Sequence, residues 1–457
     1  MEASAPDISS LFCTQEKFFA SGATRALSFR RETLKRLCQE VERRSDDIIA
    51  ALRSDLSRPP VETWLSEIYF VLNEGRHLDR NLEKWAKPVR TGQPLFFLPA
   101  RSEYRHEPQG RILIAGAWNY PLQLSLCPLM GAVAAGNCVV LKPSEHAPAT
   151  STLLAELIGS VFSPEHVAVV EGGPDTGAAL LDLPFDHFFC TGGENIGRRF
   201  AEAAAKHLVP ATLELGGKCP CLVDKGLNLA RAVERIAWGK FFNAGQTCVA
   251  PDFVLVPEDD REEFVHLLQA QLERCYRENP CDELASIVND HHYQRLRRLI
   301  PPEAIVIGED EPEARFLAPR VIPNASWDSP AMQEEVFGPI LPIIGYSSLD
   351  EALEKMRRLP APLALYCFSE SSATCEKVAG SMSSGAVCFN DVGKPTLNTM
   401  LPFGGVGPSG YGRYHGEAGF KNFSYERAYV HRSLLRDPFL ILPPYKGRLA
   451  FVRRFLK

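Results

Sequence analysis

A thiol and a carboxylate that could act together lie within one short stretch of the chain. Glu214 opens the run Glu-Leu-Gly-Gly-Lys, and Cys248 closes the run Gly-Gln-Thr-Cys a little further along. A thiolate is a strong nucleophile, and a glutamate can act as a general base toward water. Gly245 permits a sharp backbone turn before the thiol, so that Cys248 would be presented to a ligand instead of being packed into a core. The pair predicts covalent catalysis by a cysteine.

Neither residue carries this interpretation alone. The chain has 13 cysteines, and most free cysteines in proteins are small buried hydrophobes, while a glutamate beside two glycines is more often a surface residue. Three further patterns add weight: Gly116-Ala-Trp118-Asn119-Tyr-Pro121, Lys142-Pro-Ser-Glu145 and Glu335-Val-Phe337-Gly-Pro339.

Together these patterns resemble those of the aldehyde dehydrogenase superfamily, from about Phe18 to Arg432. The details Ala-Trp-Asn-Tyr-Pro, Thr-Cys-Val-Ala-Pro and Pro-Phe-Gly-Gly-Val-Gly look most like the class 3 branch, which includes fatty and aromatic aldehyde dehydrogenases. The resemblance implies oxidation of an aldehyde to the carboxylic acid with NAD and/or NADP as cofactor. It also implies a homodimer.

The chemistry of such an oxidation assigns a role to each catalytic candidate. Hydride transfer requires an sp³ carbon bearing an oxyanion, which Cys248 makes by adding to the aldehyde as a thiolate. The side-chain amide of Asn119 and the backbone N–H of Cys248 would donate to that oxyanion. Glu214 would activate the water that hydrolyses the resulting thioester.

The elements that must position these groups follow from alternating patterns. Strand-like runs at 111–117, 138–142, 167–171 and 185–191 alternate with helical stretches, which predicts a doubly wound parallel sheet. Ligands of such sheets bind beyond the carboxyl ends of the strands, where Lys142 and Thr191 lie. Residues 24–57 and 63–85 show helical periodicity, and the apolar stretch 122–135 predicts a buried helix.

Two glycine-rich segments compete for the cofactor phosphates. Residues 405–410 match GxGxxG, but no strand precedes them, so we expect a loop. Residues 192–197 follow a strand and open a helix expected at 198–205, whose dipole favours phosphates. Gly192, Gly193 and Gly197 are therefore the phosphate-site candidates. Gly193 departs from the family, which commonly has a serine there.

The resemblance implies the remaining cofactor contacts. Trp118 belongs to the cofactor-site set, Lys142 would bond the adenosine ribose, and Glu145 would accept from its hydroxyls. Glu335 would hold the nicotinamide ribose, with Phe337 packed beside it. A carboxylate near the 2′-position favours NAD over NADP, although class 3 relatives accept both.

The predicted fold is α/β: a Rossmann-type cofactor domain with a parallel sheet, an α/β catalytic domain and a discontinuous oligomerisation arm. The cofactor domain takes residues 1–80 and 104–213, and the catalytic domain 214–392. The arm takes 81–103 and 393–430. The tail, 431–457, is apolar and basic; packing against the partner subunit or its own domain is favoured, with peripheral membrane contact as the alternative.

Composition narrows the class of protein. The 457 residues carry a formal net charge of −6, which argues against a nucleic-acid partner. The N-terminus lacks the pattern of a secretory signal, no apolar stretch has the ~20 residues of a transmembrane helix, and an odd number of scattered cysteines is typical of a cytoplasmic protein. Cys219-Pro-Cys221 has no second pair at zinc spacing, so no metal is expected.

Three alternatives compete with the dehydrogenase. A Cys–His hydrolase needs a recognisable histidine context, which is not apparent, and an acylating dehydrogenase that uses coenzyme A would generally lack Glu214. A non-catalytic binding protein would be expected to lose Cys248, Glu214 or Asn119. Aromatic and apolar residues near Tyr69, Phe70, Tyr120 and Leu122, and the loop 392–400, favour a hydrophobic aldehyde, aliphatic or aromatic.

Overall fold

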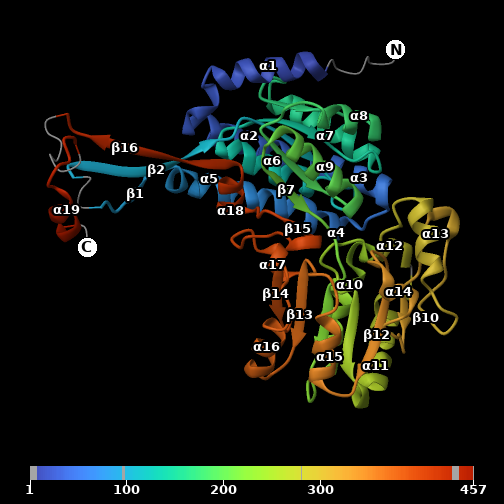
Figure 1. Ribbon diagram of the computed structural model, residues 1–457. Coiled ribbons are helices and arrows are strands. Elements are labelled where there is room, and N and C mark those ends of the chain that lie inside the picture. The colour runs from blue at the N-terminus through green and yellow to red at the C-terminus, as the bar shows by residue number, and fades with distance from the viewer. Residues whose placement is uncertain (1–7, 95–97, 279, 435–441, 456–457) are drawn as a thin grey trace, which may run out of the picture.

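Three β-sheets organise the chain (Figure 1). The computed structural model describes residues 8–94, 98–278, 280–434 and 442–455. A six-stranded sheet and a seven-stranded sheet form the two halves of the body, and a three-stranded sheet projects from it.

The six-stranded sheet has the order β15-β7-β6-β3-β4-β5. Its strands are β3 (Arg111–Ala115), β4 (Cys138–Lys142), β5 (Val167–Val169), β6 (His187–Thr191), β7 (Ala211–Glu214) and β15 (Gly410–Tyr411). Strands β3 to β7 are parallel, and α6 (Gln123–Ala135), α7 (Pro148–Val161), α8 (Pro174–Leu181) and α9 (Glu194–His207) connect them. The doubly wound parallel sheet is confirmed. Every residue of α6 is buried, as the apolar stretch predicted.

The seven-stranded sheet has the order β10-β11-β12-β9-β8-β13-β14 and is parallel except at β10. Its strands are β8 (Pro220–Val223), β9 (Phe253–Pro257), β10 (Ile305–Val306), β11 (Arg320–Ile322), β12 (Ile340–Tyr346), β13 (Ala364–Phe368) and β14 (Ala386–Phe389). The helices of this half are α10 (Leu229–Phe241), α11 (Arg261–Tyr276), α12 (Pro280–Glu283), α13 (Asp290–Arg298), α14 (Pro330–Gln333), α15 (Leu349–Met356), α16 (Ser372–Ala379) and α17 (Lys394–Leu397).

The N-terminal helices pack beside the six-stranded sheet. They are α1 (Ile8–Ala20), α2 (Leu27–Arg43), α3 (Ser45–Leu56), α4 (Pro60–Thr63) and α5 (Phe70–Trp85). Leu34, Leu37 and Val41 of α2 are fully buried, as helical spacing predicts. The helix expected at 63–85 starts earlier, because α4 continues through a π-helical segment, Trp64–Tyr69, into α5. Helix α1 was not predicted.

The three-stranded sheet contains β1 (Val89–Thr91), β2 (Ala100–Pro108) and β16 (Ser424–Arg432), all antiparallel. In Figure 1, β2 and β16 run side by side away from the body. Between 393 and 423 the chain takes other positions: β15 pairs with β7, and α18 (Gly416–Asn422) packs on α5 and α6. The predicted arm segment 393–430 therefore reaches the projecting sheet only at Ser424, while β2 extends to Pro108.

The two chemical candidates lie in different halves of the body. Glu214 is the last residue of β7, and β8 begins at Pro220. Cys248 lies between α10 and β9 of the second half. The remaining described helix is α19 (Leu449–Phe455), in the tail. No helix among the described residues combines the length and the apolar composition needed to cross a bilayer.

Candidate active site

The turn that presents Cys248 has an unusual backbone. Asn243, Ala244 and Gly245 all adopt left-handed φ angles, of 53°, 51° and 71°. A β-carbon at Gly245 would lie 2.2 Å from the carbonyl oxygen of Gly338, so only glycine fits there. The left-handed conformation costs roughly 1–2 kcal/mol for each residue that has a β-carbon. Contacts around the turn must offset that cost.

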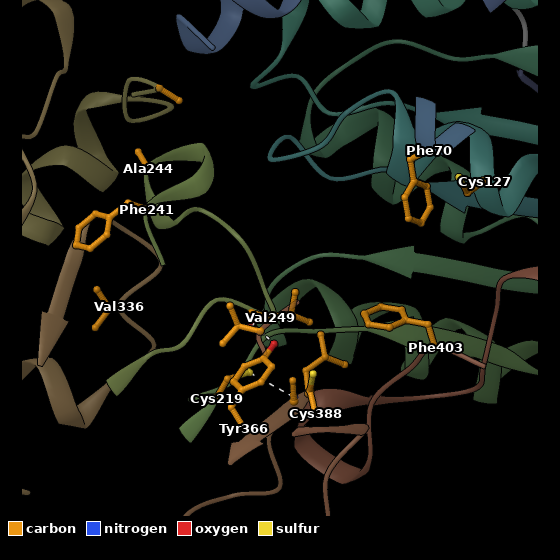
Figure 2. Packing of buried hydrophobic residues seen from close by; sticks show 14 of the residues in the cluster. Phe70, Cys127, Cys219, Phe241, Ala244, Val249, Val336, Tyr366, Cys388 and Phe403 are labelled. Carbon is orange, nitrogen blue, oxygen red and sulfur yellow. Dashed lines mark hydrogen bonds between the residues drawn. The ribbon is translucent and has the colours of Figure 1, made fainter. Parts of the chain in front are cut away.

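Side chains at the seven-stranded sheet hold the backbone of Cys248 and of the next residue, Val249 (Figure 2). The hydroxyl of Tyr366, on β13, donates to the carbonyl of Val249 at 2.5 Å, and the thiol of Cys219 donates to the carbonyl of Cys248 at 3.4 Å. Cys219 in turn accepts from the backbone N–H of Ala364 at 3.3 Å. Cys219 is thus a support of the active-site backbone. The described residues hold no group of three or more His, Cys, Asp or Glu side chains that could bind a metal.

The protein environment keeps Cys248 protonated. Burial raises the pKa of the Cys248 thiol to about 12, and the nearby carboxylates of Glu335 and Glu214 add to the shift. Hydrogen bonds from the backbone N–H groups of Cys248 and Val249 act in the opposite direction. The thiolate therefore needs additional positive charge in the site, or loss of its proton during attack.

Glu214 is buried without a partner. Its side chain is on the last residue of β7, and both carboxylate oxygens lack a hydrogen-bond donor. Burial raises the pKa of Glu214 well above its ordinary value, and the charge of Arg413 offsets only part of this. A buried polar group without a partner is uncommon in proteins and indicates a functional or unfilled position.

The side-chain amide of Asn119 contacts the loop that carries Cys248. Asn119 is buried, and its Nδ2 donates to the carbonyl of Gln246 at 3.1 Å, two residues before the thiol. An amide nitrogen has two N–H groups, so one remains for a ligand. Beside it, the hydroxyl groups of Tyr120 and Thr247 lie 2.6 Å apart. The structure therefore brings Asn119 to the backbone of the loop that carries Cys248.

Cys248 lines an apolar pocket of about 310 Å³. Its walls come from the π-helical segment, α5, α6, α10, α17 and the loop before α18; they include Leu65, Tyr69, Phe70, Tyr120, Leu124, Trp238, Phe242, Leu397, Phe403 and Tyr414. Tyr69, Phe70 and Tyr120 thus line the pocket, as do Gly393, Lys394, Thr396 and Leu397 of the loop 392–400. Leu122 does not, because its side chain is fully buried behind the wall.

A second cavity, of about 290 Å³, lies at the carboxyl ends of β3, β4 and β6. Trp118, Lys142, Glu145, Gly192 and Gly193 all line it. The Nζ of Lys142 donates to Glu145 Oε2 at 2.9 Å. This is the crevice in which an open parallel sheet binds a dinucleotide.

The second cavity suits a nicotinamide cofactor. The hydroxyl of Thr191 is buried there without a partner, and a β-carbon on Gly193 would meet no atom within 4 Å. Helix α9 begins at Glu194, with Gly193 as its N-cap, so its first N–H groups face the cavity. The expected start at 198 was wrong by one turn. Gly197 lies inside this helix, where a β-carbon would lie 2.7 Å from Leu215.

Glu335 and Phe337 line neither cavity, but Glu335 lies near Cys248 of the first and Phe337 contacts Trp118 of the second. A β-carbon on Gly216 would lie 2.0 Å from Oε2 of Glu335, so the carboxylate rests directly on the Glu-Leu-Gly-Gly-Lys loop. Burial raises the pKa of Glu335 to about 8. The rings of Phe337 and Trp118 meet edge to face with centroids 5.4 Å apart. Lys218 is not free for chemistry, because it is bonded to Asp252.

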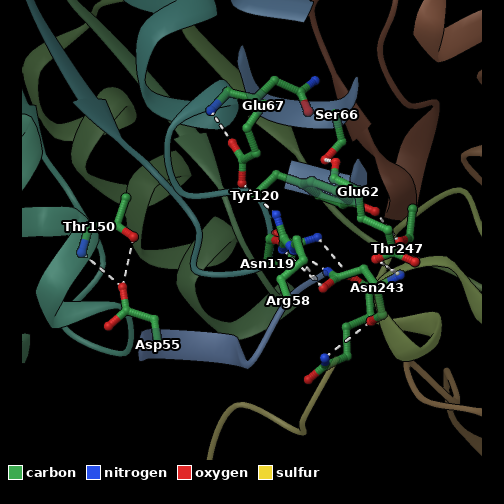
Figure 3. Close-up of polar contacts among 12 residues, drawn as sticks. Asp55, Arg58, Glu62, Ser66, Glu67, Asn119, Tyr120, Thr150, Asn243 and Thr247 are labelled. Atoms are coloured by element: carbon green, nitrogen blue, oxygen red, sulfur yellow. Dashed lines mark hydrogen bonds and ion pairs between the residues drawn. The ribbon is translucent and has the colours of Figure 1, made fainter. Parts of the chain in front are cut away.

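One group of site residues was not predicted from the sequence. Arg58, Glu62, Glu67 and Asn243 form polar contacts around Asn119 (Figure 3). No local pattern marks these residues, because Arg58 lies in the link between α3 and α4 and its partner Asn243 is 185 positions away.

Comparison with known proteins identifies the family. The model of the aldehyde dehydrogenase family matches residues 1–429. The chain belongs to the aldehyde dehydrogenase family. A 4,4'-diaponeurosporen-aldehyde dehydrogenase of Staphylococcus aureus is 40% identical over 98% of both chains. Aldehyde dehydrogenase family 3 member B1 of Homo sapiens is 43% identical, over 91% of this chain and 89% of its own length.

Solved structures of aldehyde dehydrogenases share the fold. A substrate-bound state of Staphylococcus aureus AldH gives a TM-score of 0.95 at 40% identity, covering 98% of this chain and 99% of that one. An NAD+ complex of an aldehyde dehydrogenase from Bacillus cereus gives 0.85 at 25% identity, covering 93% and 88%. The resemblance seen in the sequence, to the class 3 branch, is confirmed. The chain is an NAD(P)-dependent oxidoreductase that converts an aldehyde to the acid through a cysteine thiohemiacetal and a thioester.

Proposed function

We propose that Cys248 is the nucleophile, Glu214 the general base and Asn119 the side-chain oxyanion donor in the oxidation of a hydrophobic aldehyde. One observation carries this assignment: Cys248 lines an apolar pocket, and the nearby carboxylate of Glu214 is buried without a hydrogen-bond partner. The amide of Asn119 is tied to the same loop.

The roles follow from what each atom can do. Sγ of Cys248 adds to the aldehyde carbon, and the developing oxyanion accepts from Nδ2 of Asn119 and from the backbone N–H of Cys248. The nicotinamide ring, when bound, supplies the acceptor for the hydride. Water then attacks the thioester while Glu214 takes its proton, and the C–S bond breaks to release the acid and the Cys248 thiolate. Because burial raises the pKa of Glu214, the base gains activity as the pH rises.

The cofactor contacts are proposed as follows. Trp118 belongs to the cofactor site, and Lys142 and Glu145 hold the adenosine ribose. Gly192 and Gly193 with the first N–H groups of α9 hold the phosphates. Gly197 acts by letting α9 pack closely against Leu215.

We further propose that Glu335 holds the nicotinamide ribose, with Phe337 beside it. Both NAD and NADP are accepted. Glu145 disfavours a 2′-phosphate by repulsion, whereas Lys142 and Arg199 in the same cavity supply positive charge to it.

The substrate is an apolar aldehyde, aliphatic or aromatic. The wall of the first pocket is mainly apolar, and several apolar side chains of this wall and of the loop 392–400 that follows it are exposed. Leu65, Tyr69, Leu397, Met400 and Leu401 are each more than two-fifths exposed. Exposed apolar surface beside a pocket is typical of a site that binds an apolar ligand.

The projecting sheet supports a homodimer. Val430 and Tyr425 on β16 are 59% and 46% exposed, and an extended sheet with open edges readily pairs with another chain. Sedimentation should therefore give twice the chain mass. All thirteen cysteines are free thiols, which supports a cytoplasmic location.

The tail is proposed to pack against the partner subunit. Leu449 and Phe451 of α19 are exposed and lie close to Arg453 and Arg454. The same features suit a membrane surface, which remains the alternative. Sedimentation with anionic vesicles separates the two: the partner-packed tail leaves the protein in the supernatant.

The test of the catalytic assignment is formation of the reduced cofactor from a panel of aldehydes, with NAD and NADP compared. Cys248→Ala should abolish turnover with every substrate. Cys13→Ala is the control for losing a thiol, and it should retain turnover because Cys13 is exposed on α1 and lines neither cavity. Turnover that survives Cys248→Ala would refute the assignment.

A further inference from the structure

A buried ion pair lies beneath Asn119. Arg58, in the link between α3 and α4, and Glu67, in the π-helical segment, are both fully buried, and Arg58 Nη1 lies 2.7 Å from Glu67 Oε1. A buried ion pair seldom adds net stability, because both charges lose their hydration. Its position beside the catalytic loop therefore calls for another explanation.

The other donors of Arg58 lead to Asn119. Its Nη2 donates to the backbone carbonyl of Asn119 and, at 2.9 Å, to Oδ1 of Asn243, to which Nε also donates at 3.1 Å (Figure 3). The guanidinium group of Arg58 thus holds both the main chain of Asn119 and the side chain of Asn243.

Asn243 continues the connection to the Asn119 amide. Its Nδ2 donates to the Asn119 carbonyl at 3.0 Å and to the Gln246 carbonyl at 3.1 Å. The Gln246 carbonyl is the acceptor that holds Nδ2 of Asn119. Arg58 is therefore linked to both ends of the Asn119 residue, through its backbone and through its side-chain acceptor.

Glu67 secures the other side of this arrangement. Its Oε2 accepts from the backbone N–H of Gln123 at 2.7 Å, at the start of α6. The short segment from Asn119 to Gln123 is thus held at its first residue by Arg58 and at its last by Glu67. The planar guanidinium serves three acceptors in fixed directions, which a lysine ammonium cannot reproduce.

We propose that Arg58, held by Glu67, is a positioning residue that sets the amide of Asn119 toward the oxyanion of the thiohemiacetal. The inference rests on the proposed function, in which Asn119 is an oxyanion donor. It extends the site to a residue that touches neither substrate nor cofactor.

The test is a double-mutant cycle on aldehyde oxidation with Arg58→Lys and Asn119→Ala. Arg58→Lys keeps a cation for Glu67 but loses the fork. It should lower kcat by about 10- to 100-fold, since small misplacement of a catalytic group has effects of that order, and leave the KM for NAD unchanged. In the Asn119→Ala background the same change should lower kcat by less than about threefold.

Two further variants serve as a control for the loss of a buried arginine and as a substitute for Arg58→Lys. Arg30→Lys is the matched control, because Arg30 is a buried arginine that donates to the carbonyls of Thr24 and Ala134 instead. It should lower the melting temperature but not kcat. If Arg58→Lys does not fold, Asn243→Asp replaces it, since aspartate keeps the acceptor for Arg58 and removes the donor to Gln246 and Asn119.

The outcomes separate the two levels of the argument. Asn119→Ala without loss of kcat would overturn the oxyanion role, and the inference with it. A loss in Asn119→Ala together with an equal effect of Arg58→Lys in both backgrounds would overturn the inference alone. An unchanged kcat in Arg58→Lys would also overturn it.

Discussion

Replacing Gly216 by alanine should weaken cofactor binding without touching the cofactor. The added β-carbon would lie 2.0 Å from Oε2 of Glu335, whereas ordinary contact begins near 3.4 Å, so the carboxylate must move by more than 1 Å. Such a shift breaks the proposed hydrogen bond between Glu335 and the nicotinamide ribose, because donor–acceptor distances of hydrogen bonds span only about 0.5 Å. Above pH 8, where the Glu335 carboxylate is ionised, a hydrogen bond to it is worth about 1.5–3 kcal/mol, which corresponds to roughly a 10- to 150-fold rise in the KM for NAD.

The assay is the KM for NAD at saturating aldehyde, with the dissociation constant of NAD measured separately by calorimetry. Gly159→Ala is the control, because a β-carbon on that glycine of α7 meets no atom within 4 Å. Glu335→Ala supplies the reference loss. If Glu335→Ala raises the KM and Gly216→Ala does not, the loop yields instead of the carboxylate, and the steric reasoning is refuted.

Three further outcomes are expected. Glu214→Gln should keep a burst of reduced cofactor in stopped-flow measurements but slow the steady state by at least about 100-fold; loss of the burst would contradict a role confined to thioester hydrolysis. Thr396→Trp should narrow the substrate pocket, lowering kcat/KM at least about tenfold for long-chain aldehydes and little for propanal; equal losses would count against this pocket as the substrate site. Burial raises the pKa of Glu74 to about 8, so between its unfolded value near 4.5 and pH 8 the native state holds the extra proton and stability falls as pH rises, by up to about 1.4 kcal/mol per pH unit. Between pH 5.5 and 8, urea unfolding of Glu74→Gln should show a smaller fall in the free energy of unfolding than the parent protein shows. An equal fall in both proteins would contradict the raised pKa of Glu74.

The sequence predicted the parts of the site that depend on local pattern. The parallel strands were readable because buried apolar runs alternate with helical stretches, and Lys142 and Thr191 do lie at strand ends. The start of α9 was misplaced because glycine lowers helix propensity, whereas close packing of Gly197 on Leu215 requires glycine inside the helix. The two-residue strand β15 is too short to give a signal.

Long-range polar contacts could not be predicted. Arg58 and Asn243 are 185 positions apart, and no local pattern announces their pairing. Leu122 was placed in the substrate wall by its neighbours, but it is fully buried at the start of α6. Which side of a helix faces a pocket depends on packing that periodicity alone does not define.

The π-helical segment Trp64–Tyr69 constrains how this enzyme could acquire new substrates. Leu65 and Tyr69 form part of the wall of the apolar pocket, while Glu67 between them is buried and paired with Arg58. Removing one residue would restore α-helical winding and rotate one side of the segment by about 100° relative to the other. Specificity and turnover would then change together. We therefore expect substrate specificity to change by substitution of the side chains at 65 and 69, and not by changes in the length of this helix.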